Sequence, residues 1–226
     1  MIAYTADISA LENDVVFSKM YTLANTGRRQ KIDRMRFGKD KRLSLGVEML
    51  LMHACHDFGI DYANQQIDYD SHEKPFFADS KIHFNLSHSE QRVMCVMASN
   101  PVGCDVEKIT DIDLDIARRY FFRKEFEAIE KCRTQVEKND MFFRLWTLKE
   151  SFMKCTGLGF YLPLNEFEVS IKDSGPTVRQ NVDDSTYEFS EWNADDGYKY
   201  AVCMKKQNCN EETEWKKIRL DGQTVL

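Results

Sequence analysis

Residues 103–109 place two carboxylates, Asp105 and Glu107, in a run with the alternation of a β-strand. Side chains at i and i+2 of a strand project from one face, about 7 Å apart. Without a cation between them the two acids repel, by about 4 kcal/mol at 4 Å and an effective dielectric near 20. Mg2+ suits such oxygen ligands, because it takes one or two protein carboxylates and completes its shell with water and substrate phosphates. The segment therefore predicts a strand that carries a Mg2+ site, with a third acid and a phosphate-bearing ligand supplied elsewhere.

The composition limits the classes of protein to which the chain can belong. Its 226 residues, 42% of them hydrophobic, suffice for one large domain or two small ones. A net charge of -6 gives no general attraction to nucleic acid or to an anionic membrane. No apolar stretch approaches the length of a membrane span, and the seven cysteines include no CxxC pair. We therefore expect a cytoplasmic protein with neither nucleic acid nor membrane as partner.

The segment 28–42 is strongly basic although the chain as a whole is acidic. It contains eight lysines and arginines, among them Arg28, Lys31 and Arg42. A charge run of this kind is either a solvated helix face or an anion site. The local excess of positive charge in an acidic chain favours an anion site.

Two long helices are predicted from apolar residues at helical spacing. The first covers residues 43–58 and ends at Gly59, and the second covers 139–154 and ends at the glycines 157 and 159. Glu150 and Lys154 on the second helix are four residues apart, which fits an ordinary helix salt bridge as well as a pair of functional side chains. Between the helices, residues 82–86 and 92–98 are predicted to be strands joined by a polar turn over residues 87–90.

The order of these segments is repeated along the chain. Each half contains a basic helix, then a long helix that ends at glycine, then strands, which in the second half are expected at 167–171, 186–189 and 198–204. We predict an α+β fold with two similar halves, residues 1–100 and 101–226, related by a pseudo-two-fold axis. Each half would have a small, mainly antiparallel sheet packed on its long helix, with the active site in the cleft between the halves. Residues 205–214 are expected to form a mobile connection.

Several motifs together resemble one family. The pattern Gly103-x-Asp105-x-Glu107 is followed about forty residues later by Trp146-x-x-Lys149-Glu150-x-x-x-Lys154. This pair resembles the 4'-phosphopantetheinyl transferase superfamily, specifically its long, surfactin-synthetase-activating type. Further segments are similar to that family's N-x-SHS hairpin, its G-K-P element and its basic coenzyme A segment: Phe84 to Ser89, Lys74-Pro75 and Arg28 to Lys31. Two positions depart from the family's pattern. Glu73 stands where the family usually has glycine, and Arg28 is not equivalent in shape to lysine.

The resemblance implies an enzyme that transfers the phosphopantetheine arm of coenzyme A to a serine hydroxyl of an apo acyl or peptidyl carrier protein and releases adenosine 3',5'-bisphosphate. Such carriers serve fatty-acid, polyketide or nonribosomal peptide synthesis. Asp105, Glu107 and Glu150 would hold Mg2+, for which Mn2+ could substitute, and Glu150 and Lys154 would be catalytic. The coenzyme would be bound by Arg28, Lys31, Arg42, Ser44, Lys74, Pro75, Ser87, His88 and Lys154. Because both halves are present in one chain, a monomer is expected.

Two other functions use the same residues. A Mg2+-dependent phosphodiesterase or nuclease could employ the same acids, although the acidic chain lacks the mixture of basic and aromatic residues typical of nucleic-acid binding. A non-catalytic protein that binds coenzyme A or a carrier could retain the same fold. The segment 118–124, which is basic and aromatic, is a candidate surface for the acidic helix of a carrier and equally fits a core helix with solvated arginines.

Overall fold

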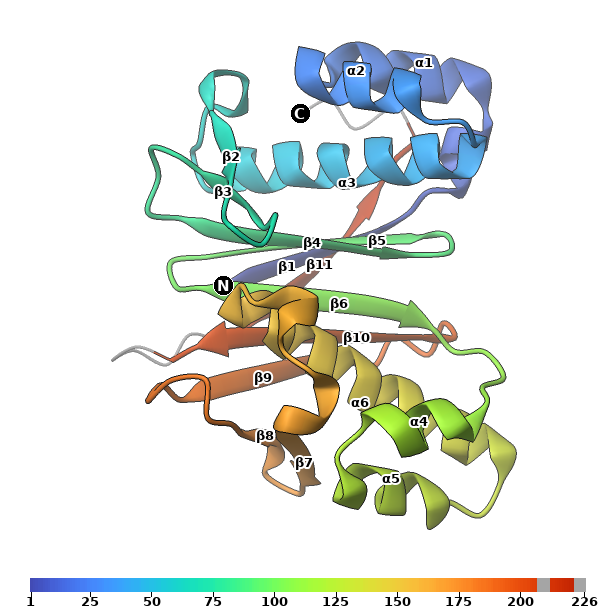
Figure 1. The fold of residues 1–226 in the computed structure, drawn as a ribbon. Helices are drawn as coiled ribbons and strands as arrows, with labels where there is room; N and C mark the ends of the chain where they lie inside the picture. Colours follow the sequence, from blue (N-terminus) through green and yellow to red (C-terminus); the bar gives the residue numbers. More distant parts are fainter. Residues whose placement is uncertain (207–211, 222–226) are drawn as a thin grey trace.

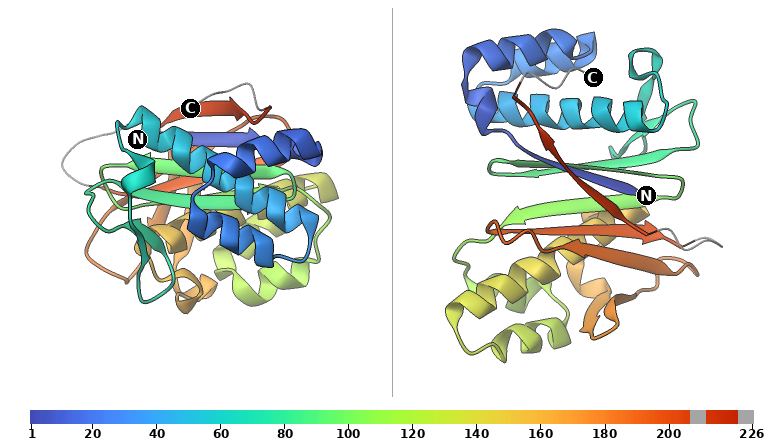
Figure 2. Two further views of the ribbon diagram at one scale, coloured as in Figure 1. Left: turned by 90° about the horizontal axis from the view of Figure 1, so that it is seen from above. Right: turned by 180° about the vertical axis from the view of Figure 1, so that it is seen from behind.

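The computed structural model describes residues 1–206 and 212–221. It has an α+β fold in which two small sheets lie between two long helices (Figure 1). The first sheet has the strand order β11-β1-β5-β4, and the second has the order β6-β10-β9. The helix α3 covers the first sheet and α6 covers the second, as the view from behind also shows (Figure 2). The predicted pair of sheet-and-helix halves is therefore confirmed.

The first half of the chain supplies most of the first sheet and the helices above it. Its elements are β1 (Ile2–Asp7), η1 (Ser9–Glu12), α1 (Asp14–Leu23), α2 (Thr26–Arg34), α3 (Gly38–Asp57), η2 (Tyr62–Asn64), β2 (Ile67–Tyr69), β3 (Pro75–Phe77), β4 (His83–Ser89) and β5 (Arg92–Ala98). The strands β2 and β3 form a separate antiparallel hairpin.

The second half supplies the second sheet and its covering helix. Its elements are β6 (Val102–Lys108), α4 (Leu114–Tyr120), α5 (Arg123–Glu130), α6 (Gln135–Thr156), η3 (Gly159–Tyr161), η4 (Leu164–Glu166), β7 (Glu168–Lys172), β8 (Gly175–Arg179), β9 (Tyr187–Trp192), β10 (Tyr198–Lys205) and β11 (Glu214–Arg219). The strands β7 and β8 form a second separate hairpin. Among the described residues no helix has the length and apolar character needed to cross a bilayer.

The predicted helix ends agree with the backbone. Gly59, just beyond α3, and Gly157, which caps α6, adopt left-handed conformations with φ of 65° and 80°. Glycine takes this conformation without the steric cost that a Cβ imposes. Glycine residues therefore end both long helices, as the sequence indicates.

Alternation along the strands divides the core into three clusters. On β5, Val93 and Cys95 face the cluster under α3, whereas Met94 and Val96 face a cluster that joins the two sheets. On β6, Cys104 points into this joining cluster. The opposite face of β6, which carries Gly103, Asp105 and Glu107, therefore lies toward α6.

The hairpin between β4 and β5 corrects one prediction. The polar turn was expected at residues 87–90, but β4 continues through Ser89, and only Glu90 and Gln91 form the turn. Glu90 has a φ of 51°, as tight two-residue hairpin turns require. Ser87 and His88 therefore lie on a strand and point to opposite faces of the first sheet, rather than together from a loop.

The strand β11 returns the end of the chain to the first half. It pairs in parallel with β1, with Glu214 opposite Ile2 and Arg219 opposite Asp7. Neither β11 nor the hairpin strand β8 was predicted. Of the expected connection at residues 205–214, Lys205 belongs to β10 and Glu214 to β11, and residues 207–211 lie outside the described residues. The division at residue 100 stays a prediction, and β11 crosses it.

The backbones of β6 and α6 lie very close together at Gly103. A Cβ at this position would overlap the carbonyl oxygen of Ser151 and the amide nitrogen of Cys155. Because both are backbone atoms of a long helix, α6 would have to move away from β6 to make room. Gly103 thus fixes the spacing between the strand that carries Asp105 and the helix that carries Glu150.

We predict that Gly103→Ala lowers the free energy of unfolding by about 1–3 kcal/mol, as overpacking of a dense core does. The measurement is urea unfolding followed by circular dichroism. Gly27→Ala is the matched control, because a Cβ there meets nothing closer than 3.5 Å and lies within α2. Equal stability of the two variants would contradict the close approach.

Candidate functional site

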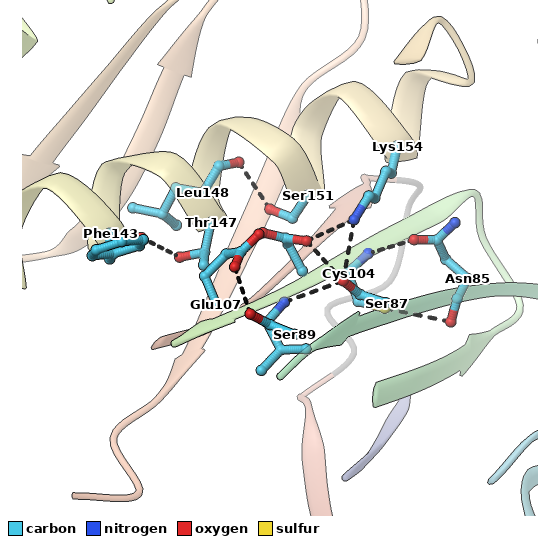
Figure 3. A network of polar contacts seen from close by, with 12 residues as sticks. Asn85, Ser87, Ser89, Cys104, Glu107, Phe143, Thr147, Leu148, Ser151 and Lys154 are labelled. Atoms are coloured by element: carbon cyan, nitrogen blue, oxygen red, sulfur yellow. Dashed lines mark hydrogen bonds and ion pairs between the residues drawn. The ribbon is translucent and has the colours of Figure 1, made fainter. Parts of the chain in front are cut away.

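The two sheets meet along β4 and β6, each of which is an edge strand of its own sheet. Three side chains of β4 accept hydrogen bonds from backbone amides of β6, and Figure 3 shows those of Asn85 and Ser87. Asn85 Oδ1 accepts from the Cys104 amide at 2.9 Å. The hydroxyls of Ser87 and Ser89 accept from the amides of Val106 at 3.4 Å and Lys108 at 3.2 Å. The three side chains are spaced two residues apart on β4, and the three amides are spaced two residues apart on β6. We call this row of hydrogen bonds the seam.

The two serine hydroxyls of the seam also hold the acids of β6. Ser87 Oγ donates to Asp105 Oδ1 at 2.8 Å, and Ser89 Oγ donates to Glu107 Oε2 at 2.7 Å. Each hydroxyl therefore uses its lone pairs on a backbone amide and its proton on a carboxylate. The N-x-S-x-S pattern fixes both the strand junction and the positions of the two acids.

Lys154 reaches the same point from α6. Its ammonium donates to Asp105 Oδ1 at 2.6 Å and to Ser87 Oγ at 3.2 Å. Although burial acts to lower it, the pKa of Lys154 is raised, because Asp105 stabilises the charged form. The helix and both edge strands thus converge on one carboxylate.

Burial makes the charged forms of the predicted acids costly. Burial, followed by the charge of Asp105, raises the pKa of Glu107 to about 7. Burial also raises the pKa of Glu150 to about 7, against the opposing effect of Lys154 and with a contribution from Asp105. The second oxygen of Asp105, Oδ2, is buried without a hydrogen-bond partner. An unpaired buried carboxylate oxygen is costly, and a cation would relieve that cost.

The donor set fits Mg2+ in its chemistry. Carboxylate oxygens are the ligands that this ion prefers, and it needs few of them from the protein when phosphate and water complete its shell. Among the described residues, however, no three His, Cys, Asp or Glu side chains lie close enough together to enclose a metal ion. A metal site shared by Asp105, Glu107 and Glu150 therefore stays a prediction.

A cavity of about 680 Å3 opens between α2, α3, the β2–β3 hairpin and the outer face of β4. Arg28, Lys31, Pro75 and His88 line it. A neighbouring cavity of about 270 Å3 shares Arg28, Lys31 and His88 and adds Ser44. The basic segment and His88, predicted to bind one anionic ligand, are thus brought together beside the seam.

Arg28 is held in this cavity by a carboxylate that sequence reasoning missed. Its Nε donates to Glu48 Oε2 at 2.8 Å, and its Nη1 donates to Ser44 Oγ at 3.4 Å. Glu48 is fully buried on α3. The signal in the sequence was a carboxylate on the apolar helix between Val47 and Met49, since a buried acid requires a partner.

Four of the predicted coenzyme ligands line neither of these cavities: Arg42, Lys74, Ser87 and Lys154. Ser87 and Lys154 lie at the seam instead. The guanidinium of Arg42 lies 3.9 Å from Glu12 Oε1. The ammonium of Lys74 is directed at backbone carbonyls near the end of α6. Their roles in coenzyme binding stay predictions.

Lys149 is adjacent to Glu150 in the sequence but points into the core. Its ammonium donates to Glu125 Oε1 at 2.6 Å and to the carbonyl of Phe167 at 2.9 Å, with no solvent exposure. Glu125 also accepts from the amide of Val169 at 2.6 Å. This ion pair joins α5, α6 and the start of β7. It holds α6, the helix that carries Glu150 and Lys154, against α5 and the start of β7.

Comparisons with known proteins show which proteins the chain resembles. The sequence model of the 4'-phosphopantetheinyl transferase superfamily matches residues 101–203, and that of the 4'-phosphopantetheinyl transferase N-terminal region matches residues 13–102. A 4'-phosphopantetheinyl transferase of Bacillus subtilis is 33% identical over 87% of this chain and 87% of that protein. The 4'-phosphopantetheinyl transferase Sfp of Bacillus subtilis strain 168 is 33% identical over 78% of this chain and 80% of its own length. The 4'-phosphopantetheinyl transferase gsp of Aneurinibacillus migulanus is 31% identical over 83% of this chain and 79% of its own length.

Removing one acceptor of the seam should destabilise the fold. We predict that Asn85→Ala lowers the free energy of unfolding by about 1–3 kcal/mol, because the buried amide of Cys104 loses its acceptor. Urea unfolding measures this. Asn64→Ala is the control: its side chain is exposed, bonds only to Asp61 nearby, and should change stability by less than about 0.5 kcal/mol. A loss for Asn85→Ala no larger than this would contradict the role of the seam.

Breaking the buried ion pair should cost more. We predict that Lys149→Met lowers stability by about 3–5 kcal/mol, because Glu125 is left buried without its counter-charge. Adding Glu125→Gln should recover part of this loss, since a neutral amide oxygen can still accept from the Val169 amide. Lys124→Met, which removes an exposed ammonium 3.5 Å from Glu168, should cost about 1 kcal/mol or less. Thermal or urea unfolding of the unchanged protein and the three variants measures the order of their stabilities. A double variant less stable than Lys149→Met would contradict the prediction.

Proposed function

Because the chain belongs to the 4'-phosphopantetheinyl transferase superfamily, we propose that it transfers the phosphopantetheine arm of coenzyme A to a serine hydroxyl of an apo carrier protein. One observation supports this most directly. Asp105, Glu107 and Lys154 are held at the seam, and the cavity that contains Arg28, Lys31 and His88 lies on the other face of the same strand, β4. A long ligand with phosphates could extend from the cavity to the acids.

The proposed reaction is a phosphoryl-type transfer. The oxygen of the carrier serine forms a bond to the phosphorus that bears pantetheine, and the bond from that phosphorus to adenosine 3',5'-bisphosphate breaks. The serine proton passes to a base, and the leaving group takes up the electron pair. Such a transfer needs positioning and neutralisation of charge rather than a protein nucleophile.

The cavity residues are proposed to bind the coenzyme through its phosphates. Arg28 and Lys31 come from α2, and His88 reaches the same space from β4. Ser44 contacts Arg28 and lines the smaller cavity, so it would act on the same ligand. Pro75 lines the larger cavity and would contact the apolar part of the coenzyme.

The acids are proposed to hold Mg2+ once the coenzyme is bound. Asp105, Glu107 and Glu150 would supply carboxylate oxygens to it, and Mn2+ would suit the same ligands. When bound, the ion neutralises negative charge on the pyrophosphate and orients it. Ser87 and Ser89 keep Asp105 and Glu107 in place.

Glu150 and Lys154 are proposed to take part in the chemistry itself. The Glu150 carboxylate would accept the serine proton, directly or through one water. Lys154, already at the carboxylate of Asp105, would contact the coenzyme phosphates and stabilise the charge that develops on the leaving group. Both side chains project from one face of α6, four residues apart.

The carrier and the assembly state are the outer parts of the proposal. Residues 118–124 are proposed as the carrier surface: Tyr120 is exposed and Arg123 is mostly exposed, whereas Phe121 is buried in the core. We propose a monomer, since β4, β6 and α6 of one chain supply the whole site. We also propose a cytoplasmic enzyme, because the six cysteines that the structure describes are free.

The test is incubation of the protein with coenzyme A, Mg2+ and apo carrier proteins of fatty-acid and peptide synthesis, read by intact mass. We expect a mass gain of one phosphopantetheine arm and the appearance of adenosine 3',5'-bisphosphate. Asp105→Asn should reduce the rate by about 100-fold or more, since it removes the charge at the centre of the site while keeping the shape.

Asp173→Asn is the matched control, because this exposed carboxylate lies in the turn between β7 and β8. The transfer rate of this variant should equal that of the unchanged protein. Full activity of Asp105→Asn would refute the assignment of the acid cluster. No modified carrier, together with cleavage of a simple phosphodiester, would favour the phosphodiesterase instead.

A further inference from the structure

Lys74 joins the first half of the chain to the end of the helix that carries Lys154. Its ammonium donates to the carbonyl of Lys154 at 2.6 Å, to that of Val102 at 3.1 Å and to that of Cys155 at 3.4 Å. An ammonium group has three protons, and these three acceptors use all of them. All three protons of the Lys74 ammonium are therefore donated to backbone carbonyls of the second half.

The position of this ammonium has an electrostatic reason. The last carbonyls of a helix lack intrahelical partners and form the negative end of the helix dipole. α6 ends at Thr156, so the carbonyls of Lys154 and Cys155 belong to its last turn. A lysine from another part of the chain thus caps α6, at the residue whose own side chain binds Asp105.

The loop that carries Lys74 is shaped to reach this point. Asp70 Oδ1 accepts from the amides of His72 at 2.8 Å and Lys74 at 3.0 Å, which closes a tight turn. Glu73 has a φ of 65°, a left-handed conformation that explains why glycine is usual at this position in the family. The ring of His72 packs on that of Tyr161, with centroids 4.8 Å apart. The turn therefore docks on the segment that follows α6.

The same hairpin also forms a wall of the coenzyme cavity. Tyr69, Glu73 and Pro75, which flank Lys74, line the 680 Å3 cavity. A ligand in that cavity would contact the hairpin on one side, while Lys74 contacts the end of α6 on the other. The hairpin is thus a direct link between the cavity and Lys154.

We propose that Lys74 is a positioning residue. It links the β2–β3 hairpin, which lines the coenzyme site, to the last turn of α6. The position of the hairpin thereby determines the position of that turn and of the Lys154 ammonium. This rests on the proposed transfer reaction and differs from a contact between Lys74 and a coenzyme phosphate. A phosphate contact would act on coenzyme binding, whereas a positioning role acts on the rate of the bound complex.

The test compares Lys74→Met with Lys81→Met, an exposed lysine before β4. Calorimetry gives the Kd for coenzyme A, and the carrier-modification assay gives kcat. We expect Lys74→Met to lower kcat by about 10- to 100-fold, as displacement of a catalytic group by about 1 Å does, with a Kd within about threefold of the control. A raised Kd with unchanged kcat would overturn the inference in favour of a phosphate contact. An unchanged Kd together with an unchanged kcat would also overturn it.

A second pair of variants covers the case in which Lys74→Met does not fold. Asp70→Ala removes the acceptor that shapes the turn and leaves Lys74 in place, whereas Asp70→Asn keeps an oxygen at the same position. Asp70→Ala should lower kcat in the same manner, and Asp70→Asn should retain it. Equal kcat values for the two would count against the link through the hairpin.

Hydrogen exchange separates this inference from the proposed reaction. Amides in the last turn of α6, including that of Gly157, which bonds to the carbonyl of Lys154, should exchange several-fold faster in Lys74→Met or Asp70→Ala than in Lys81→Met. Unchanged exchange would refute the cap whatever the activity. If the unaltered protein modifies no carrier, the proposed function fails, while faster exchange would still show that Lys74 sets the end of α6.

Discussion

The fold and the site depend on the hydrogen bonds of Ser87 and Ser89. Two edge strands present backbone amides that require acceptors, and a protein must either pair or cover them. Here the side chains of β4 supply the acceptors, so the two sheets join without a continuous backbone ladder. The protons of the same hydroxyls hold Asp105 and Glu107. The junction between the halves and the placement of the acids are therefore one set of bonds, and neither can be changed alone.

The helix α6 completes the site because it is held on two opposite sides. Gly103 allows its backbone to lie directly on β6, which brings Lys154 to Asp105. Lys149 points to the opposite side and is anchored by Glu125 in the core of the second half. The helix is thus fixed by a close backbone contact on one side and a buried ion pair on the other. A helix held in this way keeps Glu150 in place relative to the strand.

Local patterns in the sequence predicted what local physics controls. The alternation of β6, the shared face of Asp105 and Glu107, and the glycine ends of both long helices follow from residue type and spacing. The turn at residues 87–90 was wrong because the serines looked like loop residues, while their acceptors and donors lie on a strand some twenty residues away. The strand β11 could not be foreseen either, since it pairs with β1 across nearly the whole chain. Motif resemblance supplied the predicted set of site residues, but not which partner each would contact.

The pair of Arg28 and Glu48 shows why the type of cation matters at the proposed coenzyme site. Glu48 is buried and needs a counter-charge, and Arg28 supplies it through Nε while Nη1 reaches Ser44. A guanidinium has five donors in a fixed fork, so it can satisfy the carboxylate and still present N–H groups to an anion. A lysine at this position would have one ammonium to divide between Glu48 and a phosphate. Arginine at position 28 therefore lets one side chain serve the core of α3 and the cavity at once, which a lysine could do only by weakening one of the two contacts.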